Sequence, residues 1–386
     1  MNSPLSSVAG PIPPAASAPA ASSRLVSIDA LRGLVILLML VDHTREFFYA
    51  AHPVSDPMDL ASTAPDLFFT RLSAHLCAPV FVALAGTAAW LFGASRGGAR
   101  QASAFLLKRG LFLVALELTI VNFAWGFDPT PPIVYLQVIW AIGLSMIALA
   151  GLVHLPRGPL IAVGAVLVLG HNLLDPIAFA PGEPGRVLWA ILHDRGMIDL
   201  PFGGQARTSY PLLPWIGVIA LGYAAGPWFA KVVPAPIRLR RLVTAGAAAI
   251  LLCALLRGAN TYGDPTPWTA APDPLATVMS VLNLTKYPPS ADFLLLTLGL
   301  GLLLLALIER VGGRLPTWLA VFGSAPLFFY LLHLYLLHAL NLAVPSLPSV
   351  GWLWLLAAVV ALPCWFACRS FARAKRRSGW WLMRYL

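Results

Sequence analysis

Charged residues and cysteines are scarce in this sequence. Only 11% of its 386 residues are Asp, Glu, Lys or Arg, whereas 59% are hydrophobic and the mean hydropathy is +0.78. An average soluble domain contains about 25% charged residues, so this shortage excludes an ordinary soluble domain and indicates a polytopic membrane protein. The chain has four cysteines, none in CxxC spacing: Cys77, Cys253, Cys364 and Cys368. We therefore expect neither a disulfide nor a zinc site.

Motifs of soluble enzymes are missing as well. No phosphate-cradling glycine loop, GxSxG elbow or SxxK motif stands in a supporting context, so nucleotide chemistry of the soluble type is unsupported. Neither HxxxH nor HExxH spacing occurs, and we expect no metal. The net charge of +10 and pI near 9.8 would suit nucleic acid, but the basic residues lie in short loops between apolar runs. That pattern reports membrane topology, and no nucleic-acid partner is expected.

Ten apolar runs are long enough to cross a bilayer as helices, which takes about 20 residues each. They lie at about 29–50, 75–94, 104–124, 132–153, 159–178, 210–230, 241–257, 291–309, 317–341 and 350–368. With a cytoplasmic N-terminus, 19 of the 26 basic residues fall on the inner side and seven outside, as the positive-inside rule requires. We predict an all-α polytopic protein with about ten transmembrane helices and both termini cytoplasmic.

The two ends of the chain differ from the apolar middle. Residues 1–23 are rich in Pro, Ala and Ser and carry no charge, so we predict a disordered tail and not a signal peptide. Residues 24–370 form the predicted transmembrane domain. Residues 371–386 combine cations with Trp380, Trp381 and Tyr385 and are predicted to lie on the anionic inner surface of the membrane.

The first predicted span, about residues 27–48, carries ionisable groups at both ends. At about 100° per residue, one stripe of this helix contains Asp29, Arg32, Gly33, Ile36, Leu40 and His43. Ionisable groups inside a membrane usually face a cavity or a partner, and roughly 16 Å of helix separates Arg32 from His43. The alternative is that these groups only mark the two interfaces. Asp42 lies off the stripe and is predicted to pair with Arg45.

Histidines gather toward the predicted outer side. His75 begins the second predicted span, four residues before Pro79, and a helix N-terminus disfavours the imidazolium and so favours a neutral base. His43, near the end of the first span, experiences the opposite dipole, an arrangement that divides acid and base roles. The alternative is that each histidine only bonds a loop carbonyl. His333 lies deeper in its span and is a better cavity candidate than His338.

Glu117 is the one acid predicted near the middle of the membrane, with Asn122 on the same helix and Gln137 on the next. An unpaired carboxylate there is costly. We therefore expect a partner such as Arg32, Arg109 or an imidazole. The alternative is a helix-packing hydrogen bond without a chemical role.

Five runs between residues 24 and 226 carry a resemblance that, in order and spacing, covers roughly residues 24–340: RLVSIDALRGLVILLMLVDHTREFF, HLCAPVFVALAGTAAWL, FLLKRGLFLVALELTIVNFAW, LQVIWAIGLSMIALA and YPLLPWIGVIALGYAAG. Together they resemble the bacterial branch of the heparan-alpha-glucosaminide N-acetyltransferase-like family of transmembrane acyltransferases. The resemblance implies a cytoplasmic acyl-CoA donor, typically acetyl-CoA, and a sugar or glycan acceptor beyond the membrane, which here would be a bacterial cytoplasmic membrane. It also implies an essential outer histidine near the first two helices, for which the candidates are His43, His52 and His75.

These inferences define a predicted site. We expect His75, and after it His43, to act in catalysis, since a neutral imidazole can deprotonate an amine or hydroxyl or accept the acyl group. The cations at the inner helix ends are expected to bind the phosphates of the CoA donor: Arg32, Lys108 and Arg109. A polar cavity would connect the two groups through Asp29, Glu117, Asn122, Gln137 and His333.

Two other functional classes remain open from the sequence. A transporter for a small solute or a lipid-linked sugar would use the same polar stripe to line an alternating-access path. A structural scaffold would not need the buried charges and is disfavoured. Membrane lipid and a homodimer are the further partners considered.

Overall fold

The structure is a computed structural model and describes residues 25–49, 58–201, 203–378 and 383. The predicted tail 1–23 and His52 lie outside these residues. The described chain is mostly helical, as predicted. The principal helices are α1 Val26–Phe48, α2 Pro65–Ser73, α3 Cys77–Arg96, α4 Ala99–Leu116, α5 Asn122–Gly126, α6 Val138–Leu152, α7 Arg157–Leu169, α8 Arg186–Leu192, α9 Leu212–Ala225, α10 Ala235–Ala259, α11 Pro274–Leu282, α12 Ala291–Val311, α13 Arg314–Gly323, α14 Pro326–Asn341 and α15 Val350–Arg377.

Short segments of other geometry join these helices. The 3₁₀ turns are Ala74–Leu76, His171–Leu174 and Gly226–Phe229, and a π-helical turn spans Glu117–Val121. The strands are β1 Ile133–Leu136, β2 Met197–Asp199 and β3 Gln205–Thr208. They form one sheet in the order β1-β3-β2, with β1 parallel and β2 antiparallel to β3. The sequence did not predict this sheet.

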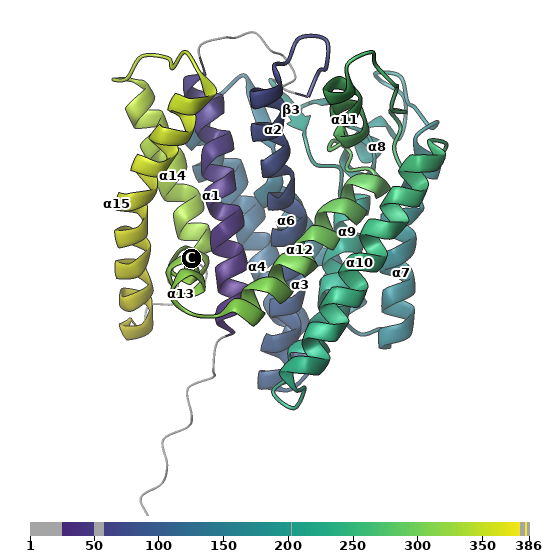
Figure 1. Ribbon diagram of the computed structural model, residues 1–386, viewed down its shortest axis with the longest axis vertical. Helices are drawn as coiled ribbons and strands as arrows, with labels where there is room; N and C mark the ends of the chain where they lie inside the picture. The colour runs from purple at the N-terminus through teal and green to yellow at the C-terminus, as the bar shows by residue number, and fades with distance from the viewer. Residues whose placement is uncertain (1–24, 50–57, 202, 379–382, 384–386) are drawn as a thin grey trace, which may run out of the picture.

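The sheet, α8 and α11 lie at one end of the helical bundle, the upper end in Figure 1. We call it the sheet end. At the opposite end α1 begins and α3 turns into α4 at Gly97 and Gly98 (Figure 1). Both glycines have positive φ, 106° and 90°, a conformation that favours glycine because it has no Cβ. We call this the α3–α4 end.

Five continuous helical segments of the described chain are long and apolar enough to cross a membrane, and a sixth would be a bent pair of helices. The five are Pro65–Arg96, Leu212–Phe229, Ala235–Ala259, Ala291–Val311 and Val350–Arg377. The other predicted spans are not confirmed by this criterion. Helices α6 and α7 have only 15 and 13 residues, below the roughly 20 that a bilayer needs, and α1 and α4 carry several charged side chains.

Three predicted boundaries are wrong. The second span does not begin at His75, because α2 starts ten residues earlier at Pro65 and continues through a 3₁₀ turn into α3. The predicted span 317–341 is two helices that meet at 75°, since α14 starts anew at Pro326, which has no backbone N–H to donate and disfavours the helical conformation in Ala325 before it. The predicted span at 132 begins with strand β1, and its helix starts at Val138.

Glycines let the main helix pairs approach closely. A Cβ on Gly33 of α1 would lie 1.9 Å from the carbonyl oxygen of Leu319 in α13, and a Cβ on Gly222 of α9 would lie 2.1 Å from that of Ala83 in α3. Close backbone contact at small residues is how helices associate where no water drives them together. Equivalent glycine pairs lie at the crossings of α4 with α6, α7 with α9 and α10 with α12: Gly110 and Gly143, Gly164 and Gly217, Gly246 and Gly299.

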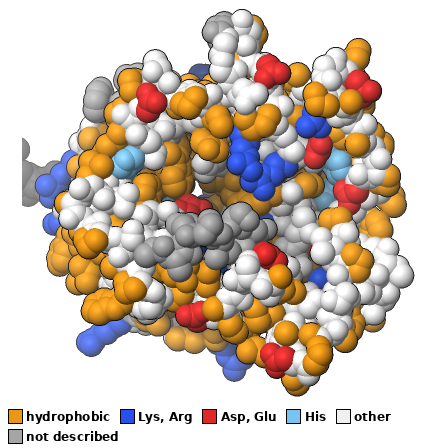
Figure 2. Space-filling model, turned by 90° about the horizontal axis from the view of Figure 1, so that it is seen from above, with side chains coloured by type: hydrophobic (Ala, Val, Ile, Leu, Met, Phe, Trp, Pro, Cys, Tyr) orange, Lys and Arg blue, Asp and Glu red, His pale blue; other side chains and the backbone are white. Residues whose placement is uncertain are grey.

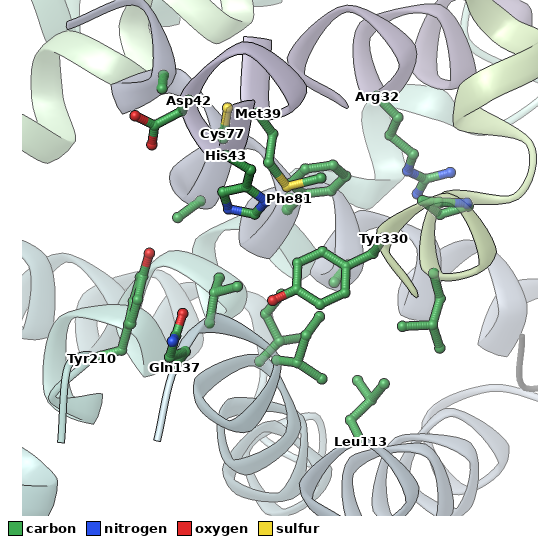
Figure 3. A pocket seen from close by; sticks show the side chains of 18 of the residues that line it. Arg32, Met39, Asp42, His43, Cys77, Phe81, Leu113, Gln137, Tyr210 and Tyr330 are labelled. Carbon is green, nitrogen blue, oxygen red and sulfur yellow. The ribbon is translucent and has the colours of Figure 1, made fainter. Parts of the chain in front are cut away.

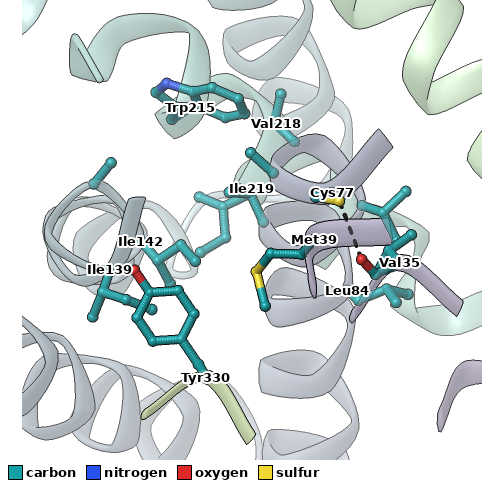
Figure 4. Packing of buried hydrophobic residues seen from close by; sticks show 14 of the residues in the cluster. Val35, Met39, Cys77, Leu84, Ile139, Ile142, Trp215, Val218, Ile219 and Tyr330 are labelled. Atoms are coloured by element: carbon teal, nitrogen blue, oxygen red, sulfur yellow. Dashed lines mark hydrogen bonds between the residues drawn. The ribbon is translucent and has the colours of Figure 1, made fainter. Parts of the chain in front are cut away.

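The core lies where α1, α3, α6, α9 and α14 meet (Figure 4). Trp215 of α9 is fully buried there. Cys77 at the start of α3 donates its thiol to the carbonyl of Val35 in α1 at 3.1 Å, which fixes these two helices together beside Met39 (Figure 4). All four cysteines are free and buried.

Candidate active site inside the helix bundle

A cavity of about 310 Å³ lies inside the bundle, lined mainly by α1, α3, α4, α6 and α14. Its cations come from opposite parts of the fold. Arg32, Arg109 and Lys375 lie on helices toward the α3–α4 end, whereas Arg71 and Lys286 belong to the sheet end. Figure 3 shows Arg32 on one side of the cavity, Asp42 and Tyr210 on the other, and His43 and Tyr330 between them. The cavity therefore joins two cationic regions through a histidine.

His43 of α1 and His333 of α14 are hydrogen-bonded to each other inside the bundle. The His43 Nδ1 atom lies 2.7 Å from the His333 Nε2 atom, and the two rings stack at 9° with centroids 5.0 Å apart. His333 is fully buried and its Nδ1 lies 2.8 Å from the carbonyl oxygen of Phe329. His43 is half-buried and lines the cavity. The two histidines that the sequence placed in separate spans are thus brought together.

These contacts determine which nitrogen of each ring carries a proton. A carbonyl oxygen only accepts hydrogen bonds, so His333 Nδ1 must donate to Phe329. A fully buried imidazole without a counter-ion is neutral, because burying an unpaired charge is costly, so His333 Nε2 accepts. His43 Nδ1 then donates, which leaves His43 Nε2 with its lone pair free for the cavity. The arrangement is that of a base oriented by a second residue.

Asp42, next to His43, organises the sheet-end wall of the cavity. Its carboxylate accepts a hydrogen bond from Arg45 Nε at 3.2 Å, which confirms the predicted pair. It also bonds Arg71 of α2, and Arg45 lies 3.3 Å from the carboxylate of Glu46. All but Glu46 are buried. A buried ion pair left without one partner is strongly destabilised, so this network anchors α2 against α1.

Glu117 does not have the cationic or imidazole partner that was expected. One carboxylate oxygen accepts from the backbone N–H of Trp140 at 3.1 Å, at the start of α6; the other has no hydrogen-bond partner among the described residues. Asn122 bonds the carbonyl of Glu117 at 2.7 Å and both backbone groups of Tyr135 in β1. These contacts join helices and strand, and neither side chain lines the cavity. Gln137, which precedes α6, does line it.

His75 lies away from the cavity surface. It sits in the 3₁₀ turn between α2 and α3, is 3% exposed, and packs against Phe293 with ring centroids 5.2 Å apart. Its Nε2 has no hydrogen-bond partner among the described residues. The premise that His75 opens a helix, with the dipole keeping it neutral, is therefore wrong. Its catalytic role stays a prediction.

The predicted donor-binding cations separate into two groups. Arg32 lines the cavity, where it lies 3.0 Å from Asp29 and donates to the carbonyl of Leu84. Arg109 also lines it, whereas Lys108 is exposed and does not. Successive residues of a helix differ by about 100° in direction, so α4 can present only one of the two to the cavity. Asp29 is buried beside Arg32 and does not line the cavity.

Several lining residues were not identified from the sequence. Lys375 was assigned to an interfacial tail, but residues 371–377 continue α15, and its side chain lines the cavity. Tyr210 and Tyr287 meet from distant loops, with hydroxyl oxygens 3.3 Å apart. Burial acts to raise the pKa of Tyr287, but Lys286 and Arg71 outweigh it and lower that pKa. In the sequence, only the adjacent Lys286 and Tyr287 in the loop before α12 could have indicated that this loop forms part of the cavity wall.

Metal ligands do not gather in the described part of the chain, which contains no group of three or more His, Cys, Asp or Glu placed to hold an ion.

Comparison with known proteins adds one finding to this geometry. The profile of the family described as heparan-alpha-glucosaminide N-acetyltransferase, catalytic, matches residues 24–258, which is more than half of the chain. The match covers α1 to α10 except the last residue of α10, and so includes His43, Arg71 and Arg109. A search of curated proteins found no matching sequence.

Proposed function

The chain belongs to the heparan-alpha-glucosaminide N-acetyltransferase catalytic family, and from this premise we propose that it is a membrane acyltransferase. It would transfer an acyl group, acetyl in the simplest case, from acyl-CoA on one side of the membrane to an amine or hydroxyl of a sugar or glycan on the other. The observation that carries the proposal is the free Nε2 of His43, held by His333, in a cavity with cations at both ends.

The donor enters from the α3–α4 end in this proposal. Arg32, Arg109 and Lys375 line the cavity there, and cations that donate charge-assisted hydrogen bonds are the groups that phosphates need. A CoA headgroup bound by these side chains would direct its narrow thioester arm toward His43, roughly 16 Å along α1 from Arg32. The nucleotide part of the donor would not have to cross the bundle.

The chemical step follows from the protonation of the histidine pair. The amine or hydroxyl of the acceptor attacks the thioester carbonyl while His43 Nε2 takes its proton. The new C–N or C–O bond forms, the C–S bond breaks, and the imidazolium returns the proton to the leaving thiolate. His333 keeps His43 Nδ1 protonated throughout and stabilises the positive charge that develops on the ring.

We place the sheet end outside and the α3–α4 end in the cytoplasm. The support is the excess of basic residues in the segments that the sequence assigns to the inner side, 19 of 26, which is typical of cytoplasmic loops. Arg96 and Arg100, at the α3–α4 end, belong to these segments. In this arrangement ten helical passes cross a bacterial cytoplasmic membrane and both termini are cytoplasmic. Reporter fusions at position 100 and the C-terminus should report the cytoplasm and a fusion at position 270 the outside. Two reversed results would overturn the direction of transfer.

Purified protein in detergent provides the direct test of the activity. Acetyl-CoA and an amino sugar are supplied, and free CoA thiol and acetylated sugar are measured together. We expect both to rise in equal amounts and only with the acceptor present. If neither product forms while vesicles containing the protein accumulate solute, the protein is a transporter and the acyltransferase proposal is wrong.

A further inference from the structure

Two cations converge on one aromatic ring at the sheet end of the cavity. The Lys286 ammonium lies 5.3 Å from the centroid of the Tyr287 ring, and the Arg195 guanidinium lies 5.2 Å from it. Figure 2, which looks onto this end, shows Lys and Arg side chains gathered at the rim of a central hollow. Both side chains therefore add positive potential at the face of this ring.

The two carboxylates that line the cavity at this end, Asp42 and Glu46, are already engaged by other cations. Asp42 bonds Arg45 and Arg71, and Glu46 lies against Arg45. Within the described residues, Lys286 has no carboxylate within ion-pair distance, although its side chain lines the cavity. The lowered pKa of Tyr287, which Lys286 and Arg71 cause against the effect of burial, is a second sign of positive potential at this wall.

We propose that this wall selects an acceptor carrying an anionic group, a carboxylate or a phosphate, beside its nucleophilic amine or hydroxyl. Lys286 binds the anion next to Tyr287 and Arg195, while the nucleophile lies toward His43 in the same cavity. The inference rests on the proposed acyl transfer and adds the charge of the acceptor to it. The cations at the other end of the cavity bind the donor, so each substrate is bound by its own set of cations.

An anionic group on the acceptor would form a stronger contact with Lys286 than a neutral sugar can. Hydrogen bonds in which one partner is ionised are roughly twice as strong as those between neutral groups. The preference that we expect, about tenfold in affinity, corresponds to about 1.4 kcal/mol.

Equilibrium binding tests the inference without requiring turnover. Glucosamine, glucosamine 6-phosphate and muramic acid, which carries a carboxylate, are titrated into the purified protein. We expect at least one of the two anionic sugars to bind about tenfold more tightly than glucosamine, and the better of them identifies the anion. Lys286→Gln should reduce the preference to about twofold or less, and Lys286→Arg should keep it. Lys231→Gln, the same change at an exposed position outside the cavity, should leave it unchanged.

Salt provides a measurement that needs no variant. Raising the ionic strength from about 0.05 to 0.5 M screens the contact and should reduce the preference of the unmodified protein for the anionic sugar. Equal affinity for neutral and anionic sugars, or an unchanged preference in Lys286→Gln, would overturn the inference. Acetyl transfer to glucosamine without any anionic preference rejects the inference alone. Anionic preference without transfer to any sugar rejects the acyltransferase proposal and leaves the anion site standing.

Discussion

His43 and His333 are 290 residues apart in the chain, and a 2.7 Å hydrogen bond joins their rings inside the bundle. The carbonyl of Phe329 accepts a hydrogen bond from the other nitrogen of His333. Both hydrogen bonds therefore donate in the same direction, from His43 to His333 and from His333 to Phe329. This leaves a lone pair on His43 Nε2 that faces the cavity. In the proposed reaction, α14 would act on the base through an imidazole that does not itself line the cavity.

We expect His43→Ala to abolish acyl transfer and His75→Ala to retain most of it. A positioned base is worth roughly 10²–10⁴ in rate, and only His43 faces the cavity. Initial rates of CoA thiol release, with donor affinity and folded yield measured on the same preparations, check this expectation. If His75→Ala loses more than His43→Ala, the base is His75, as the sequence suggested, and the geometric argument is wrong.

We propose His333 as a positioning residue, so its replacements should separate kcat from KM. His333→Leu removes the acceptor for His43 Nδ1, so we expect kcat to fall by about a hundredfold, as small misplacements of reacting groups do, while KM for the donor stays nearly unchanged. His333→Gln offers both an acceptor for His43 and a donor for the Phe329 carbonyl and should recover part of kcat. Equal losses in the two variants would indicate a purely structural role for this ring.

Hydrophobic runs predicted where helices lie better than where they begin. The run before His75 was missed because Arg71 and Asp66 make α2 less apolar. The structure explains how Arg71 is tolerated: it is buried against Asp42, a pairing between residues 29 positions apart that no local pattern displays. The break between α13 and α14 was signalled only by Pro326, and a proline alone does not tell a kinked helix from two helices.

The sequence predicted the part of the site that lies on α1, but much less of the parts contributed by other elements. The helical period placed Arg32 and His43 on one stripe, and both line the cavity. Its depth in the predicted span identified His333 as a cavity candidate. No sequence period relates two helices to each other, so the 2.7 Å contact could not be foreseen. Glu117 was expected to need a charged partner, yet a backbone N–H at the start of α6 suffices. Lys286 lies in a loop, where side-chain direction depends on tertiary contacts, and Lys375 lies on the end of α15 in a segment that was predicted as an interfacial tail.

Gly222→Ala should destabilise the protein, because a Cβ there would lie 2.1 Å from the backbone of Ala83 and the α3–α9 crossing would have to widen. Overpacking of this kind costs typically about 1–3 kcal/mol. The matched control is Gly151→Ala in α6, where nothing lies within 4 Å of the added carbon; removing a helical glycine there should leave stability unchanged or slightly higher. Apparent melting temperatures in one detergent compare the two. A Gly222→Ala protein as stable as the control would refute the close crossing.

His171, in the 3₁₀ turn after α7, should make the protein less stable in acid. Burial, with a smaller effect of the neighbouring His193, lowers the pKa of His171 from 6.5 to about 4. Between these values the unfolded chain binds a proton that the folded protein does not, so stability falls as pH drops from 6.5 to 4. The loss amounts to about 3 kcal/mol at most.

Melting temperatures at pH 7.5 and pH 5 measure this effect. His171→Gln removes the titrating group while its amide can still donate to the carbonyl of Pro289, which His171 Nε2 bonds at 2.8 Å. We expect the variant to lose less stability than the unmodified protein over this pH interval. His154→Gln, at an exposed histidine, is the control and should behave as the unmodified protein does. Identical acid losses in all three proteins would exclude His171 as the cause.

Arg109 and Lys108 provide the sharpest test of the donor site, because they are adjacent on α4 and only Arg109 faces the cavity. Arg109→Ala should weaken acetyl-CoA binding by about tenfold or more, since charged hydrogen bonds contribute about 1.5–3 kcal/mol. Lys108→Ala and Arg376→Ala, both at exposed positions, should change affinity by no more than about twofold. Arg32→Ala should also exceed these controls, because Arg32 lines the same cavity. Titration calorimetry with CoA measures all four variants. Equal losses at Arg109, Lys108 and Arg376 would mean that CoA is attracted to a diffuse positive surface, in which case the cavity is not where the donor binds.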